Sequence, residues 1–289
     1  MNDPKRRRKI PTLAVAGLFL LGPAAAIAGS VVVTIIGGDT ARADITLSDV
    51  NGTYTAEFEL EFETENLKNL TVECIGITAD TLDATEIADI ESRLPHPGQQ
   101  VIDPAFPLRV TVDPPVACGL QFQDHYEVTL ETDDLVYAPF SPYRLVKAQP
   151  GKPFQYVTGS VTSGSVRARG RAGGFSEFVI IKDQSPQYAI DCESEYTNLG
   201  VQLAIATMSP AVRRTLETDL AISHAAYEVG DYASAITLLE NFNAHCAEFG
   251  GEALPNIWRS ARDLEDTEGE LIGGTSSLDF MMGRLNGSP

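Results

Sequence analysis

Hydrophobic and charged residues alternate strictly in the segment YTAEFELEFETE, residues 54–65. In an extended chain this alternation places the phenylalanines and the leucine on one face and the glutamates on the other. The same period of two recurs in LRVTV, residues 108–112, and in YEVTLET, residues 126–132. These segments are therefore predicted to be strands with one buried and one exposed face.

The rest of the first two-thirds of the chain agrees with a β-rich fold. GGFSEFVIIKD, residues 173–183, is almost continuously apolar, which is typical of a central strand. Turn-forming residues separate the apolar runs, and one short helix is predicted in residues 83–94. Short strands at this spacing favour an antiparallel β-sandwich, for which we expect an immunoglobulin-like topology.

The hydrophobic period changes to that of helices after residue 184. Apolar stripes at three- and four-residue spacing predict three helices, with Ser209 and Pro210 at the start of the second and Asp231 capping the third. A fourth helix is predicted from Pro255, with Trp258 on its core-facing side. The chain is therefore predicted to be α+β with two segregated parts.

The domain boundaries follow from these patterns. An N-terminal segment, residues 1–28, precedes an antiparallel β-sandwich domain in residues 29–184 and a small α-helical bundle in residues 185–289. The segment AYEVGDYASAI, residues 226–236, is similar to the turn of a tetratricopeptide repeat. Because it does not recur at the 34-residue period of that repeat, we interpret it as a single helical hairpin.

The N-terminal segment has the layout of a secretory signal peptide. Five basic residues in KRRRK precede an apolar run, and Ala26 and Ala28 fit a cleavage site before Gly29. A second cleavage site is offered before Asp44. The alternative is an uncleaved membrane anchor, because the nearly uncharged residues 13–36 are long enough to span a bilayer.

The charge of the chain restricts its partners. There are 21 basic and 40 acidic residues, which gives a formal net charge of −19. That charge disfavours nucleic acid and anionic lipid surfaces, so neither is predicted as a partner. Contact with a membrane is expected only through the N-terminal segment, if it is not cleaved.

Four cysteines in an exported chain suggest disulfides, with three connectivities open. Domain autonomy favours Cys74–Cys118 in the sandwich and Cys192–Cys246 in the bundle. The geometry of a helical bundle argues against the pair Cys192–Cys246. Helices of this length would separate its cysteines by about 24 Å, whereas a disulfide tolerates Cα atoms only about 7 Å apart.

Three segments carry a resemblance to a known family: residues 163–183, SGSVRARGRAGGFSEFVIIKD; residues 226–242, AYEVGDYASAITLLENF; and residues 254–264, LPNIWRSARDL. The chain resembles an uncharacterised family of exported bacterial proteins, known only as a domain of unknown function. The resemblance implies export and a β-rich part followed by a small helical module. It supplies no catalytic residues, and the four cysteines depart from the family pattern.

The candidate ligand patch is the basic cluster Arg167, Arg169 and Arg171, which strand alternation places on one face. It is suited to an anionic ligand or to sugar carboxylates. The alternative interpretation is that these arginines neutralise a neighbouring acidic strand. The glutamates of residues 57–65 are spread along a flat strand and converge poorly on a calcium ion.

No catalytic, cofactor-binding or metal-binding motif is found, and the four histidines have no paired spacing. We therefore expect an exported, non-enzymatic protein in the periplasm or outside the cell, acting as a binding or structural module of the cell envelope. Its partner would be a protein or a glycan at the cell surface. The alternative is a hydrolase that acts on cell-surface polymers.

Overall fold

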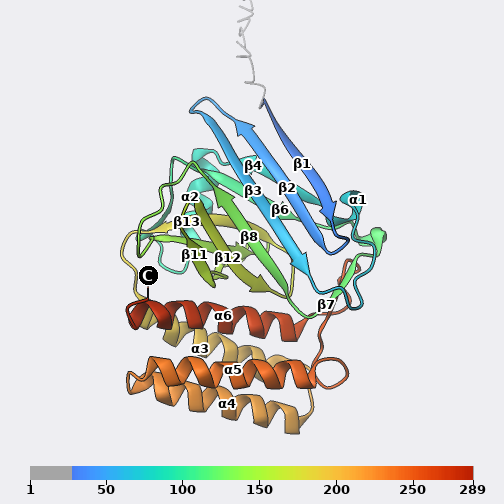
Figure 1. Ribbon diagram of the computed structural model, residues 1–289, viewed down its shortest axis with the longest axis vertical. Helices are drawn as coiled ribbons and strands as arrows, with labels where there is room; N and C mark the ends of the chain where they lie inside the picture. Colours follow the sequence, from blue (N-terminus) through green and yellow to red (C-terminus); the bar gives the residue numbers. More distant parts are fainter. Residues whose placement is uncertain (1–27, 289) are drawn as a thin grey trace, which may run out of the picture.

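The alternating segments of the chain form the strands of antiparallel sheets, as the computed structural model shows for residues 28–288 (Figure 1). The first sheet has six strands in the spatial order β1 (Ala28–Ile36), β2 (Thr40–Ser48), β3 (Thr53–Phe62), β8 (Tyr126–Thr132), β12 (Val166–Ala172) and β11 (Ser160–Thr162). The second has the order β10 (Gln155–Tyr156), β9 (Tyr143–Ala148), β13 (Glu177–Asp183), β6 (Leu108–Val112) and β4 (Ile77–Thr81), with β5 (Gln100–Ile102) also paired to β13. A two-stranded sheet joins β14 (Ile257–Arg259) to β7 (Gln121–Gln123).

The two large sheets share one hydrophobic core. Phe58 on β3 and Phe178 on β13 lie 5.5 Å apart between ring centroids, and both side chains are fully buried. The second sheet is buried on its other face as well, because Ile90 of α2 (Ala84–Ser92) packs there with Ile181. Burial on both faces explains why residues 173–183 are continuously apolar rather than alternating.

The helices lie mostly in the C-terminal third. Besides α2 and the four-residue α1 (Val72–Ile75), they are α3 (Tyr188–Ile205), α4 (Pro210–Glu228), α5 (Tyr232–Phe249) and α6 (Thr267–Leu285), and a short 3₁₀ helix spans Val116–Cys118. The four long helices surround a second core, with α6 nearest to the sheets (Figure 1). The fold is therefore mixed α+β, as predicted.

The predicted caps of the helices are confirmed. The Ser209 hydroxyl accepts a hydrogen bond from the Val212 N–H, and Pro210 begins α4. The Asp231 carboxylate accepts one from the Ser234 N–H at the start of α5. Both side chains satisfy an N–H that lacks a partner within the first turn.

The predicted fourth helix from Pro255 is wrong. Residues 257–259 form β14 instead, and Trp258 stacks on Phe122 of β7, with ring centroids 5.5 Å apart. Trp258 therefore packs against the core between the sheets rather than the helical core. Pairing with β7 satisfies the backbone of this short segment, and tertiary context overrides its helical spacing.

The last helix, α6, was not predicted, because the hydrophobic pattern is weak in this region. It is buried against α3, α5 and β12, so no single stripe distinguishes a core side from a solvent side. Gly273 lies where a β-carbon would come within 2.6 Å of the Arg171 carbonyl oxygen on β12. At this glycine the backbone of α6 therefore packs directly against the backbone of β12.

The predicted signal peptide or membrane anchor lies mostly in residues 1–27, which are outside the residues that the structure describes. Residues 28–36 form the edge strand β1, which agrees with the β-branched character of this segment. In the part of the chain that the structure describes, no helix is both long and apolar enough to cross a membrane. Division of the chain at residue 184 stays a prediction.

Candidate functional site

The arginine row lies on the outer face of the first sheet. Strand β12 alternates buried and accessible residues, and Arg167, Arg169 and Arg171 are the accessible ones. In the pairing with β8, Arg167 lies opposite Glu131 and Arg171 opposite Glu127. The prediction that the three side chains share one face is thus confirmed.

Two arginines of the row are engaged by glutamates of β8. Arg167 Nη2 lies 2.5 Å from Glu131 Oε2, and Arg171 Nη2 lies 3.1 Å from Glu127 Oε1. Partial burial acts to raise the pKa of Glu131, but hydrogen bonds from Ser165 and Arg167 outweigh it and hold that pKa below its usual range. These contacts agree with neutralisation of an acidic strand.

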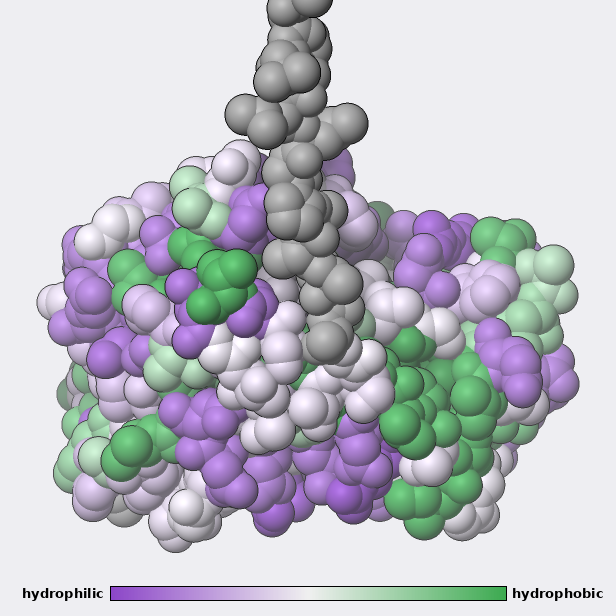
Figure 2. Space-filling view, turned by 90° about the horizontal axis from the view of Figure 1, so that it is seen from above, coloured by the Kyte–Doolittle hydropathy of each residue, from purple (hydrophilic) through white to green (hydrophobic). Residues whose placement is uncertain are grey.

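Arg169 is the exposed member of the row and lies opposite Thr129. It forms no ion pair with a carboxylate of the described residues. Figure 2 views the molecule from the sheet end and shows hydrophilic and hydrophobic residues intermixed. A ligand patch at the arginine row stays a prediction. Within the described residues, Arg169 is the arginine of this row that forms no ion pair.

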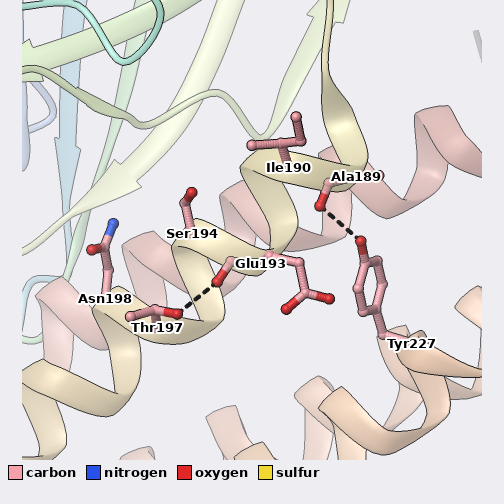
Figure 3. A pocket seen from close by; sticks show the side chains of 7 residues that line it. All are labelled: Ala189, Ile190, Glu193, Ser194, Thr197, Asn198 and Tyr227. Carbon is pink, nitrogen blue, oxygen red and sulfur yellow. Dashed lines mark hydrogen bonds between the residues drawn. The ribbon is translucent and has the colours of Figure 1, made fainter.

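An open groove lies between α3 and α4 (Figure 3). Its volume is about 590 Å³, and its lining residues are Ala189, Ile190, Glu193, Ser194, Thr197, Asn198 and Tyr227. Six of them come from α3, at the spacing that puts residues on one helix face. The Tyr227 hydroxyl donates a hydrogen bond to the Ala189 carbonyl oxygen at 2.8 Å and fixes the end of the groove. The accessible surface of the groove is therefore mostly apolar, with hydroxyl and amide groups set into it.

The groove carries one carboxylate, and that carboxylate is paired. Glu193 Oε2 lies 2.9 Å from Nε2 of His224 on α4. The Thr197 hydroxyl donates to the Glu193 carbonyl oxygen at 2.9 Å (Figure 3). A single paired carboxylate differs from the two facing carboxyl groups that most glycosidases use.

Two other histidines contact carboxylates that are distant in the sequence. His96 Nε2 lies 2.5 Å from Asp191, and His245 Nδ1 lies 2.6 Å from Asp219. His125 is partly buried, and this partial burial lowers its pKa. Within the described residues no hydrogen bond joins a histidine to a serine or cysteine side chain. The spacing of the histidines gave no signal of these pairs, because each joins two different elements.

Polar groups also lie between the sheets and the helices. Lys147 on β9 contacts Glu270 on α6 at 2.6 Å, and the Tyr156 hydroxyl lies 3.3 Å from Asp191 on α3. Arg144 is almost fully buried and stacks on Phe280, 4.9 Å from the ring centroid. The space around Arg144 leaves no room for a water molecule. We therefore interpret this cluster as a set of contacts between the second sheet and helices α3 and α6, and not as a ligand site.

No group of three or more histidine, cysteine, aspartate or glutamate side chains is arranged to hold a metal ion among residues 28–288. Glu57, on the acidic strand β3, instead forms an ion pair with Arg42 on β2. The glutamates of this strand alternate with buried residues and lie on the outer face of the sheet.

All four cysteines are free thiols. Cys74 and Cys118 lie in neighbouring connections, and each Sγ lies 3.5 Å from the carbonyl oxygen of the other residue. Cys192 and Cys246 are fully buried in the helical core. The structure thus brings together one of the two cysteine pairs expected from the sequence.

The comparisons with known proteins give a family and no activity. A family of unknown function, DUF6689, matches residues 14–286. The chain belongs to this family. No curated protein matches the chain. The region matched by the family includes the sheets, the groove between α3 and α4, and the connections that carry Cys74 and Cys118. The export that the resemblance implies stays a prediction.

Proposed function

We propose that this member of DUF6689 is an exported, non-enzymatic module that binds a glycan at the cell surface through the groove between α3 and α4. The observation that carries the proposal is the lining of that groove. Ser194, Thr197 and Asn198 offer hydroxyl and amide groups, which suit the hydroxyls of a sugar. The one carboxylate is held by a histidine, so the groove is suited to holding a polymer rather than cleaving it.

The finer fold assignment belongs to the same proposal. We infer an immunoglobulin-like sandwich from the two antiparallel sheets around one core, and a helical bundle from the four long helices around another. For export we favour cleavage after Ala28. Cleavage before Asp44 would remove β1 and half of β2, where Ala41 and Ala43 are fully buried.

Binding to an insoluble cell-wall polysaccharide tests the proposal. We expect purified protein to sediment with the polymer and to release no soluble reducing ends from it. Thr197→Arg should weaken this binding at least about tenfold, because the larger charged side chain fills the groove. Thr237→Arg is the matched control, since Thr237 is also an exposed helix threonine bonded to the carbonyl four residues earlier.

Two outcomes would contradict the proposal. Release of reducing ends in proportion to enzyme and time would favour the hydrolase, with Glu193 and His224 as the residues to substitute next. Equal binding of both threonine variants would remove the groove from the contact surface.

A further inference from the structure

Two cysteines that are 44 positions apart in the sequence face each other at one end of the sheets. The Cys74 thiol donates to the Cys118 carbonyl oxygen, and the Cys118 thiol donates to the Cys74 carbonyl oxygen, each at 3.5 Å. This reciprocal contact places each sulfur against the backbone of the other residue. A disulfide requires its two side chains to face each other in this way.

The two connections that carry these cysteines are held in register on both sides. Lys68 and Gln121 exchange backbone hydrogen bonds of 2.9 and 3.1 Å, and the Asp113 N–H donates to the Gly76 carbonyl oxygen at 3.1 Å. The Asn69 amide donates to the Gly119 carbonyl oxygen at 3.0 Å. The sulfur atoms are therefore brought together by the backbone around them and not by their own contact alone.

Cys118 is accessible to a thiol reagent, unlike Cys192 and Cys246, and Cys74 beside it is 9% exposed. Cys118 is half-buried, and the neighbouring Val72 and Val116 are exposed. Cys192 and Cys246 are fully buried, and burial raises the pKa of both thiols, which disfavours the reactive thiolate. The surroundings thus separate the four cysteines into one pair with an accessible member and two fully buried thiols.

We propose that Cys74 and Cys118 form an intramolecular disulfide, while Cys192 and Cys246 remain thiols. The oxidant is a small disulfide such as oxidised glutathione. One cysteine thiolate attacks it, forms a mixed disulfide and releases one glutathione. The second thiolate then attacks the protein sulfur of the mixed disulfide and releases another. The two cysteines lose two electrons and two protons, and one glutathione disulfide becomes two thiols.

The bridge joins two connections that cross between the sheets. The connection with Cys74 leads from β3 to β4, and the one with Cys118 leads from β6 to β7. A covalent tie at this point restricts the separation of the sheets at one end. It also closes a loop of about 45 residues, which lowers the entropy of the unfolded chain.

The same end of the sheets receives the C-terminal part of the chain. The Ser260 N–H donates to the Leu120 carbonyl oxygen at 2.9 Å, and its hydroxyl donates to the Val116 carbonyl oxygen at 3.3 Å. Arg262 pairs with Asp113, and Trp258 stacks on Phe122. The disulfide therefore stiffens the surface on which residues 257–262 dock before α6 begins.

Thiol counting and peptide mapping test the proposal on the full protein. After equilibration with oxidised and reduced glutathione, the denatured protein should contain two free thiols, against four after dithiothreitol. A non-reducing digest should yield one cross-linked peptide, joining Cys74 to Cys118. Reduction should lower Tm by roughly 10 °C, given the size of the closed loop.

Variants separate the bridge from a general effect of the reductant. Cys74→Ser/Cys118→Ser should lose the dependence of Tm on dithiothreitol, and Cys192→Ser should keep it. The emission of Trp258, the one tryptophan of the chain, should shift on reduction in the unsubstituted protein and not in the double variant.

Four free thiols after oxidation would overturn the proposal, as would a peptide that joins Cys192 to Cys246. If the double variant fails to fold, the map of the unsubstituted protein still decides the connectivity. The proposed bridge is tested independently of glycan binding, since Cys74 and Cys118 lie in connections between strands and the groove lies between helices.

Discussion

Replacing Gly273 by alanine is expected to destabilise the protein, whereas the same replacement at Gly200 is expected to stabilise it. Both glycines lie inside long helices, Gly273 in α6 and Gly200 in α3. Alanine stabilises a helix interior by about 1 kcal/mol relative to glycine. A β-carbon at Gly200 meets no atom within 4 Å, so that gain should be measured in full.

At Gly273 the added methyl group would lie 2.6 Å from the Arg171 carbonyl oxygen, and that atom belongs to the backbone of β12. The neighbour is not the end of a flexible side chain, so α6 must move away from the sheet. Overpacking of this kind costs typically about 1–3 kcal/mol beyond the gain in helix propensity. We therefore expect Gly273→Ala to lower the free energy of unfolding by about 2 kcal/mol.

Urea unfolding of Gly273→Ala, Gly200→Ala and the unsubstituted protein measures these differences in the free energy of unfolding. Circular dichroism at a helical wavelength and the fluorescence of Trp258 should report one coincident transition, since Trp258 packs against the core between the sheets and α6 packs on β12. Equal stability of the two variants would mean that α6 does not approach the sheet closely. Two separate transitions would mean that the helices unfold independently of the sheets.

The strands and helix caps could be predicted from the sequence because they depend on local patterns. Residues 54–65 alternate because one face of β3 lies in the core and the other meets solvent. Ser209 and Asp231 cap helices through contacts three residues along the chain. Such features need no knowledge of distant segments.

The docking of the C-terminal part could not be predicted in this way. Trp258 has helical spacing with its neighbours, but its position is decided by Phe122, which lies 136 positions earlier. Helix α6 has no clear stripe because it is enclosed on several sides. The groove has no motif either, since its residues are ordinary helix-surface residues of α3 and become a site only beside Tyr227.

The buried carboxyl groups were also hidden in the sequence. Glu195 stands between polar residues in CESEY, where it is typical of a solvent-facing position. In the structure it lies between α3 and α6 and is 8% exposed. The burial of this carboxyl group has a measurable consequence for the stability of the protein.

The protein is expected to be more stable at pH 5.5 than at pH 8, and Glu195→Gln is expected to reduce that difference. Burial raises the pKa of Glu195 to about 7 from its ordinary value of 4.5. Glu270 and Asp191 act in the same direction, while Lys147 and a long hydrogen bond from Asn198 oppose it. Between these two pKa values the folded protein holds a proton that the unfolded chain has lost.

The direction of the effect follows from this proton. Unfolding releases it, so the stabilisation is fully present below about pH 4.5 and is lost as the pH rises through about 7. For one such carboxyl group, the free energy of unfolding should fall by about 2 kcal/mol between pH 5.5 and pH 8. Burial also raises the pKa of Glu268 to about 7, and this group adds to the same trend.

Urea unfolding at the two pH values tests this expectation. Glutamine at position 195 cannot ionise and can still accept the hydrogen bond from Asn198. Glu195→Gln should therefore raise stability at pH 8 and remove about 2 kcal/mol of the pH dependence. Glu217→Gln on α4, where the side chain is exposed, is the matched control for the change in net charge. If both variants keep the full pH dependence, Glu195 is ionised in the folded protein, and its position between α3 and α6 must be open to water.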